Sequence, residues 1–209
     1  MKKMDKRSLA DQVYDHIKES ILSGTLKPGE KIPEEKIAEE TGVSRTPIRE
    51  AIRRLNEFGL VEVQPRSWAA VAQLTEKQLE DLVEARVNIE VSALRSLSGL
   101  TQKISLSNLE KIQKRLEKAA EKKNWGQVFT EDSNWHLEVI KLSGNEIYLE
   151  LLERLDARIQ LARLQKCRNE KVIQKDVAYH RSIMDLMAKS KFKKAADLLG
   201  QHISSAGSN

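Results

Sequence analysis

The sequence is poor in the residues that cross-link or interrupt a chain. It has one cysteine, Cys167, among 209 residues, which excludes an intramolecular disulfide and fits a reducing compartment. Its four prolines all lie at or before Pro65, and from Thr75 onward the chain shows helical patterns without strand-like alternation. No apolar run is long enough for a membrane span, and the N-terminal MKKMDKRS has no apolar core after it, as a signal peptide would. We therefore expect a cytoplasmic protein with no membrane partner.

Charge is plentiful but unevenly placed. The net charge is +5, yet residues 1–72 hold 13 Lys+Arg against 12 Asp+Glu, so this part is close to neutral. Its acids gather at Glu34, Glu35, Glu39 and Glu40, directly before an arginine-rich segment. A local cationic face can still neutralise phosphates. Nucleic-acid binding must therefore be argued from the pattern rather than from the overall charge.

The segment Ile32–Leu60 has the pattern of a helix–turn–helix. A short amphipathic helix precedes Gly42, which suits a tight turn because glycine tolerates positive φ. Ser44 is a good N-cap for a second helix, and Pro47 fits the first turn of that helix, where its missing N–H breaks no helical bond. Apolar residues then repeat at helical spacing on the inner side. These are Ile48, Ile52 and Leu55.

The outer side of the second helix is cationic, because arginines recur there every four residues. A helix of this kind fits the major groove of DNA, and its first residues usually meet base edges. We therefore assign base or near-base contacts to Arg45, Thr46 and Arg49. Arg53 and Arg54 are expected to meet backbone phosphate, or to pair with Glu50 and Glu57. The alternative is a solvated helix with ordinary i,i+4 pairs such as Arg53–Glu57.

The amino-acid sequence of this segment resembles those of a known protein family. The run GVSRTPIREAIRRLNEFGLVEV, and more widely Ser8–Val71, is similar to the N-terminal winged helix of the GntR family of bacterial transcription regulators. The resemblance implies that Arg45, Thr46 and Arg49 contact DNA. It also implies a two-stranded wing, for which Leu60–Val63 and Ala69–Val71 are β-prone runs about a turn. That turn, Gln64-Pro65-Arg66-Ser67-Trp68, departs from the glycines usual in the family; we count Arg66 among the DNA-binding residues.

Only helical signals follow the wing. Thr75 reads as an N-cap with Gln78 three residues on, a capping-box pattern. Six helices are expected and should form an antiparallel bundle, with residues 204–209 as a frayed tail. Their ranges are 75–98, 105–122, 124–142, 146–165, 170–189 and 192–204. The prediction is thus a mainly α protein: a winged helix-turn-helix with a small β-hairpin at 1–72, a linker at 73–74, and an all-α bundle at 75–209.

Three of the four histidines lie on inward-facing stripes of separate predicted helices. Asp132 precedes His136 by four residues, so the two share a helical face, and His180 and His202 lie on other helices. Burying three unpartnered imidazoles is costly, because each ring has a donor and an acceptor to satisfy. A divalent metal resolves this by taking one nitrogen of each ring, with Asp132 as an anionic ligand. The alternative is three hydrogen-bonded core histidines.

A second resemblance favours the metal. Asp132-x-x-x-His136, then Ser143-Gly144-Asn145, then His180 and His202 look like the FCD ligand-binding domain of the FadR subgroup of GntR regulators, over about residues 75–205. The resemblance implies a metal held by one Asp and three His, and all four are present. Nitrogen and oxygen ligands are compatible with Zn, Ni, Mn or Fe.

Arg86 lies on the apolar stripe of its helix, between Leu82 and Ile89. Family members often bind small carboxylates against the metal with help from an arginine. The hypothesis is that Arg86 grips an effector carboxylate by a bidentate pair. The alternative is an internal ion pair with Glu90, one turn on.

These patterns together predict a metal-containing, ligand-responsive DNA-binding regulator that is not an enzyme. We expect a homodimer on a palindromic operator, because two recognition helices need a twofold partner. The partners would be double-stranded operator DNA and a small carboxylate effector. Three alternatives remain: a metalloenzyme, a regulator whose metal is purely structural, and a metal-free acyl-CoA sensor, which the polar quartet disfavours.

Overall fold

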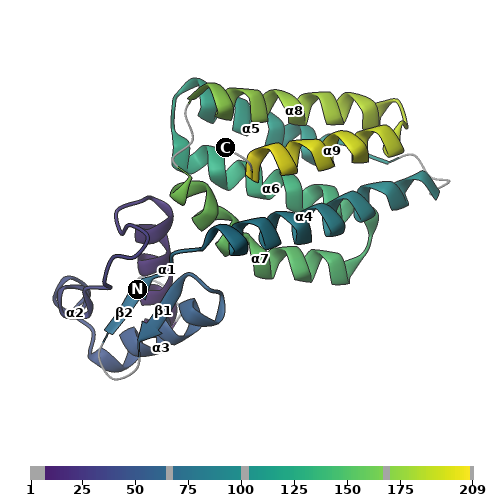
Figure 1. Ribbon diagram of the computed structural model, residues 1–209. Coiled ribbons are helices and arrows are strands. Elements are labelled where there is room, and N and C mark those ends of the chain that lie inside the picture. Colours follow the sequence, from purple (N-terminus) through teal and green to yellow (C-terminus); the bar gives the residue numbers. More distant parts are fainter. Residues whose placement is uncertain (1–7, 65–67, 100–103, 167–169, 208–209) are drawn as a thin grey trace, which may run out of the picture. The chain divides into compact units, whose positions relative to one another are not determined.

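The computed structural model describes residues 8–64, 68–99, 104–166 and 170–207. The chain divides into two compact units, Met1–Gln73 and Leu74–Asn209. Figure 1 shows helices and a β-hairpin in the first unit and a bundle of helices in the second. The first unit contains α1 (Leu9–Leu22), α2 (Glu34–Thr41), α3 (Arg45–Glu57), β1 (Val61–Gln64) and β2 (Trp68–Val71).

Local sequence signals set the ends of the N-terminal helices. Ser8 caps α1 in a capping box with Asp11, in which each side chain accepts a hydrogen bond from the other residue's backbone N–H. Gly42 ends α2 with φ at 68°, in the left-handed region. Ser44 is the N-cap of α3, as predicted, but its side chain makes no capping hydrogen bond. The turn therefore depends on Gly42.

The N-terminal core joins all elements of that unit. α3 packs against α1 and α2, and β1 packs against α3. The strands pair antiparallel, with Val61 opposite Val71 and Gln64 opposite Trp68, and an isolated bridge adds Lys31 beside Ala70. The inner face is apolar and fully buried. Its largest members are Ile17, Ile21, Ile32, Ile48, Leu55 and Leu60.

The second unit is a helical bundle. Its elements are α4 (Glu76–Ser96), a 3₁₀ turn (Leu97–Gly99), α5 (Ser107–Glu121), α6 (Trp125–Ser143), α7 (Glu146–Gln165), α8 (Glu170–Ala188) and α9 (Phe192–Gly207). α4 packs against α9, α6 and α7, while α5 packs against α6 and α8. α6 lies among α4, α5 and α7, which places its inward residues at the centre of the unit (Figure 1).

The predicted mainly α fold, with a winged helix-turn-helix and a helical bundle, is confirmed. The capping box of Thr75 and Gln78 forms as expected, and Gly144 ends α6 in the left-handed region. Most predicted boundaries differ from the observed ones by one or two residues, as at Trp68, where β2 begins one residue before the predicted Ala69. β1 begins at Val61 rather than Leu60, and α9 continues to Gly207 instead of fraying from Ser204, because Ile203 is buried and anchors that turn.

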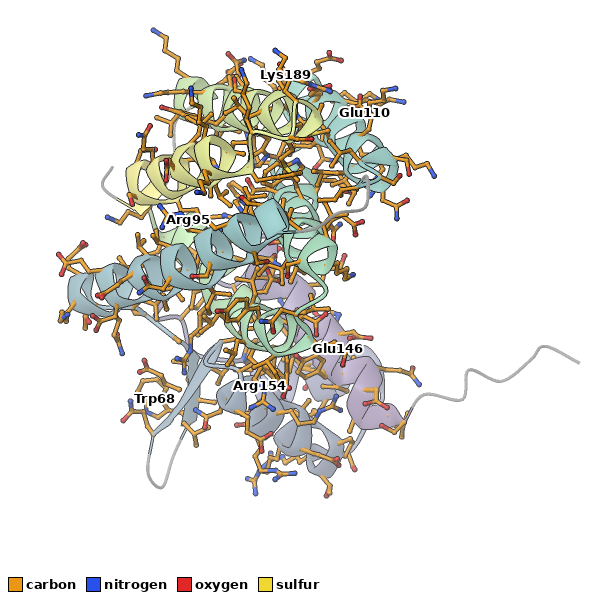
Figure 2. The ribbon with its side chains drawn as sticks, turned by 90° about the vertical axis from the view of Figure 1, so that its right-hand side faces the viewer. Trp68, Arg95, Glu110, Glu146, Arg154 and Lys189 are labelled. Atoms are coloured by element: carbon orange, nitrogen blue, oxygen red, sulfur yellow. The ribbon has the colours of Figure 1, made fainter. Side chains whose placement is uncertain are left out.

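Charged side chains cover the surface of both units. Arg95, Glu146 and Lys189 lie exposed on the bundle, and Trp68 lies partly exposed on the hairpin (Figure 2). No helix in the described part of the chain is both long enough and apolar enough to cross a membrane.

The turn at Gly42 generates a stability prediction. An alanine Cβ would meet no atom within 4 Å, so Gly42→Ala costs only the backbone strain of a left-handed residue, about 1–2 kcal/mol. Denaturant unfolding measures the loss. Gly42→Asn is the matched control and should lose less, because asparagine tolerates this conformation. Equal losses in the two variants would contradict the left-handed φ as the source of the cost.

Candidate functional site

Four metal-type ligands converge at the centre of the bundle. Asp132 and His136 lie one turn apart on α6, His180 on α8 and His202 on α9. Each offers one ligand atom, and these atoms all lie within 4.8 Å of one another. All four residues are buried. The structure therefore brings together residues that are separated by up to 70 positions in the sequence.

The imidazole Nε2 atoms face a common point. His180 Nε2 lies 3.0 Å from His202 Nε2 and 3.5 Å from Asp132 Oδ1. His136 Nε2 lies 3.8 Å from Asp132 Oδ2, and it is buried without a hydrogen-bond partner among the described residues. A buried orphan nitrogen is costly unless a ligand takes its lone pair. Three nitrogens and one carboxylate oxygen form a donor set that fits Zn, Ni, Mn or Fe.

Outer residues orient these rings. His136 Nδ1 lies 2.5 Å from Glu90 Oε2 on α4, so it donates to the carboxylate and leaves the Nε2 lone pair directed inward. His202 Nδ1 lies 3.6 Å from Asp176 Oδ1. Trp135 stacks on the His180 ring, with centroids 4.1 Å apart and planes 5° apart. Only the His136–Glu90 contact is the hydrogen bond that usually supports a metal-ligating histidine. Nδ1 of His180 and Nδ1 of His202 are buried without a hydrogen-bond partner among the described residues.

Two buried arginines balance the buried carboxylates. Arg86 Nε donates to Glu90 Oε1 at 2.8 Å, and Arg163 Nη2 on α7 donates to Asp132 Oδ2. Burial would raise the pKa of Glu90, but Arg86 and His136 outweigh it and lower the pKa to about 2. Burial likewise opposes ionisation of Asp132, yet Arg163 and the imidazoles hold its pKa well below the usual range. Both carboxylates are therefore ionised.

His180 and His202 are neutral at physiological pH. Burial lowers the pKa of His180 to about 3, helped by His136 and Arg163 and opposed by Asp132. Burial also holds the pKa of His202 well below its ordinary value. Neutral imidazoles are the form that binds a metal.

Three residues of this centre were missed in the sequence. Glu90 was predicted only as a possible ion-pair partner of Arg86, and that ion pair is present. The contact of its other carboxylate oxygen with His136 Nδ1 was not predicted. Arg163 and Asp176 were not singled out at all. Both residues are 9% exposed or less. A charged residue on the apolar stripe of a predicted helix would have pointed to them, as it did for Arg86.

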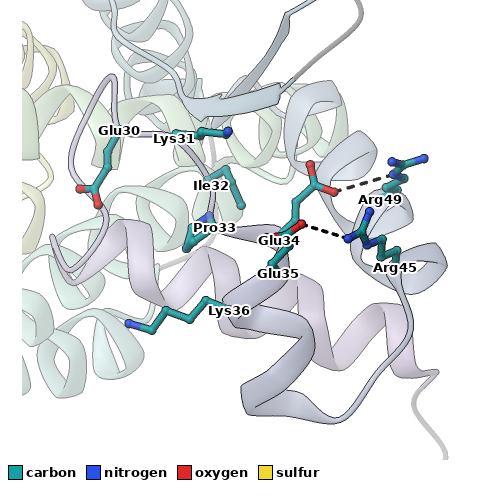
Figure 3. Close-up of a pocket in the computed structure, with 9 residues that line it drawn as sticks. All are labelled: Glu30, Lys31, Ile32, Pro33, Glu34, Glu35, Lys36, Arg45 and Arg49. Carbon is teal, nitrogen blue, oxygen red and sulfur yellow. Dashed lines mark hydrogen bonds and ion pairs between the residues drawn. The ribbon is translucent and has the colours of Figure 1, made fainter.

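The DNA-contacting residues predicted on α3 are exposed. Thr46 is exposed, and the side chains of Arg45 and Arg49 are 64% and 71% exposed. Figure 3 shows both arginines directed toward α2, where Arg45 Nη2 lies 3.0 Å from Glu35 Oε1 and Arg49 Nε lies 3.8 Å from Glu34 Oε2. Exposed pairs of this kind contribute little to stability, so DNA phosphates and bases can replace the carboxylates.

The remaining arginines of this unit differ from one another. Arg53 Nη1 lies 3.4 Å from Glu57 Oε1, the i,i+4 pair foreseen as the alternative. Arg54 was expected to meet phosphate or to pair with Glu50 or Glu57, and the structure places it elsewhere. Its Nη1 lies 2.6 Å from Asp11 Oδ1, and its guanidinium covers the ring of Tyr14 at 4.6 Å. Arg54 therefore ties α3 to α1. Arg66 falls outside the described residues.

A cationic helix beside a β-hairpin is the arrangement of a winged helix-turn-helix DNA-binding unit, and the second, helical unit carries the cluster of buried His and Asp side chains. The family comparison agrees. Residues 9–71 match the model of bacterial regulatory proteins of the gntR family, and residues 81–205 match the FCD domain. The chain belongs to the GntR family, with a C-terminal FCD domain, so it is a transcriptional regulator with an effector-binding domain.

Individual relatives support this assignment. The chain is 30% identical to the HTH-type transcriptional regulator YdhC of Bacillus subtilis (strain 168) over 193 residues, covering 92% of this chain and 84% of that one. It is 30% identical to the HTH-type transcriptional regulator McbR of Escherichia coli (strain K12) over 158 residues, 75% and 71% of the two chains.

Solved structures show the same fold. E. coli McbR/YncC has a TM-score of 0.78 at 22% identity and covers 95% of each chain. A GntR transcriptional regulator of Rhodococcus sp. RHA1 has a TM-score of 0.81 at 21% identity and covers 96% of each chain.

The contact of Glu90 with His136 generates a prediction. Glu90→Gln removes the anionic acceptor that orients the ring, and loss of such support lowers metal affinity by about 10–100-fold. A Zn²⁺ competition titration against a chromophoric chelator measures this. Glu84→Gln, an exposed change on the same helix, should leave the affinity unaltered. Unchanged affinity in Glu90→Gln would show that Glu90 does not support a metal through His136.

Proposed function

We propose that this regulator is a homodimer whose operator affinity is controlled by a small organic acid, bound at a divalent metal held by Asp132, His136, His180 and His202. The observation that carries the proposal is the convergence of these four buried ligand atoms within 4.8 Å. The orphaned His136 Nε2 supports it. The proposal includes a winged helix-turn-helix at residues 1–72, an effector- and metal-binding domain at 75–209, and action on DNA in the cytoplasm.

The protein's own residues supply most of the chemistry in this proposal. The metal would act as a Lewis acid toward a carboxylate oxygen of the effector. Arg86 is 7% exposed, and its Nε is held by Glu90. No hydrogen bond of its two Nη groups is found within the described residues. That edge of the guanidinium is suited to a second carboxylate oxygen.

Helix α4 offers a physical route from the centre to the DNA-binding unit. Arg86 and Glu90 lie on α4 and touch the ligand centre. The same helix begins at Glu76, directly after the linker at 73–74. Ten residues of helix span about 15 Å, so a shift of α4 caused by the effector is transmitted rigidly to the linker. Effector binding therefore changes how the two recognition helices of a dimer meet the operator.

Substitution of two arginines tests whether α3 enters the major groove of DNA. Arg49→Ala should cost about 1–3 kcal/mol on the operator and much less on random DNA, because a base contact is sequence-specific. Arg53→Ala should weaken both by similar factors and reduce the salt slope by about 1, as a phosphate contact does. Fluorescence anisotropy at several salt concentrations measures both. If Arg49→Ala still prefers the operator over random DNA as strongly as the wild type does, the base contacts lie on another face of the protein.

Metal-dependent control is tested by combining metal content with effector binding. Purified protein is stripped with a chelator, reloaded with Zn²⁺, Ni²⁺, Mn²⁺ or Fe²⁺, and screened by thermal shift against small organic acids. An acid present at 100 times its Kd should stabilise the loaded protein by about 2.7 kcal/mol, and it should also change operator affinity. His136→Ala should abolish both effects.

The alternatives give different results in the same experiment. Stabilisation by metal with no acid response would indicate a structural ion. Consumption of the acid would indicate an enzyme. Failure to bind any metal would overturn the proposal.

A further inference from the structure

Arg163 is built into the same centre by three contacts with α6. Its side chain is 7% exposed. Nη2 donates to Asp132 Oδ2, while Nη1 donates to Ser133 Oγ at 3.1 Å and lies 3.4 Å from the carbonyl oxygen of Phe129. The guanidinium is therefore fixed against one turn of α6. It is directed at an oxygen of the residue that would bind the metal.

This contact changes the charge of the ligand set. Metal ligation requires unprotonated ring nitrogens, so three imidazoles and one aspartate present a net charge of −1 to the cation, and Arg163 reduces it to zero. The other two carboxylates of the centre lie away from the ligand atoms. Arg86 neutralises Glu90 across 2.8 Å, and Asp176 faces the outer Nδ1 of His202 at 3.6 Å. A buried carboxylate needs a cationic partner, and here the protein supplies one.

We propose that Arg163 competes with the divalent ion for Asp132, so that it weakens metal binding and makes tight binding depend on an anion that enters with the metal. This inference rests on the proposed metal site. An ion bound beside Asp132 lies within a carboxylate's width of the guanidinium, in a region of low dielectric where like charges repel strongly. The loaded centre then has an excess of positive charge.

An anion offsets that excess. A carboxylate or another small anion placed between the metal and the arginines satisfies both, and each ligand then raises the affinity of the other by the same factor. Arg163 thus makes the metal occupancy of the site respond to small anions.

The test compares four proteins by Zn²⁺ competition titration: the wild type, Arg163→Met, Arg163→Lys and Arg115→Met. Arg163→Met should bind Zn²⁺ roughly tenfold more tightly or better, since a unit charge a few ångströms from the ion is worth more than that factor in a protein interior. Arg163→Lys keeps the charge and should stay closer to the wild type. Arg115 pairs with Glu131, next to Asp132 in the sequence, so Arg115→Met is the matched control and should change nothing.

Acetate serves as the anionic probe. In the wild type it should tighten Zn²⁺ binding, and in Arg163→Met this effect should shrink, because one positive charge is gone. If Arg163→Met unfolds without metal, the release of Zn²⁺ from loaded protein to EDTA replaces the titration, and release should be slower than in the wild type.

The outcomes separate the inference from the proposed function. Unchanged or weaker Zn²⁺ binding in Arg163→Met, or faster release, overturns the role of Arg163 while the metal site stands. Equal acetate effects in the wild type and Arg163→Met overturn it as well. If the wild type binds none of Zn²⁺, Ni²⁺, Mn²⁺ and Fe²⁺, with or without acetate, the proposed function itself is overturned.

Discussion

An ionised carboxylate in the interior of a protein requires a cation or several donors close to it, and this requirement organises the centre of the bundle. Asp132 has Arg163, and Glu90 has Arg86 together with His136. These pairs are more than ordinary surface ion pairs, because removing one member leaves an uncompensated charge in a region of low dielectric. These pairs therefore also fix the helices that carry them relative to one another.

The same contacts link helices that are distant in the sequence. Glu90 joins α4 to α6 through His136, and Arg163 joins α7 to α6 through Asp132. His180 and His202 add α8 and α9 to the centre. A ligand that alters any one of these contacts acts on five helices at once. This coupling is what a sensory domain needs, since a small event at the centre becomes a movement of long, rigid elements.

Much of the fold was predictable, because helical periodicity, caps and turn residues act locally. Thr75, Gly42 and Gly144 mark boundaries that the structure keeps. The inward direction of His136, His180 and His202 also followed from periodicity. Periodicity tells which face of a helix is buried, but not which residue of another helix lies opposite. For that reason the Glu90–His136 contact could not be foreseen. Arg54 shows the same limit, because its partner Asp11 comes from α1, 43 residues away.

The acidic residues of α2 have a consequence for the search along DNA. In the free protein, Arg49 already forms an ion pair with Glu34, and Arg45 forms one with Glu35 (Figure 3). A phosphate that takes their place exchanges one anion for another, so the gain in counterion entropy on nonspecific DNA is smaller than the number of arginines suggests. The displaced carboxylates also repel the backbone. For the proposed DNA complex we therefore expect short dwell times on random sequence and longer ones where base contacts at the operator engage the arginines.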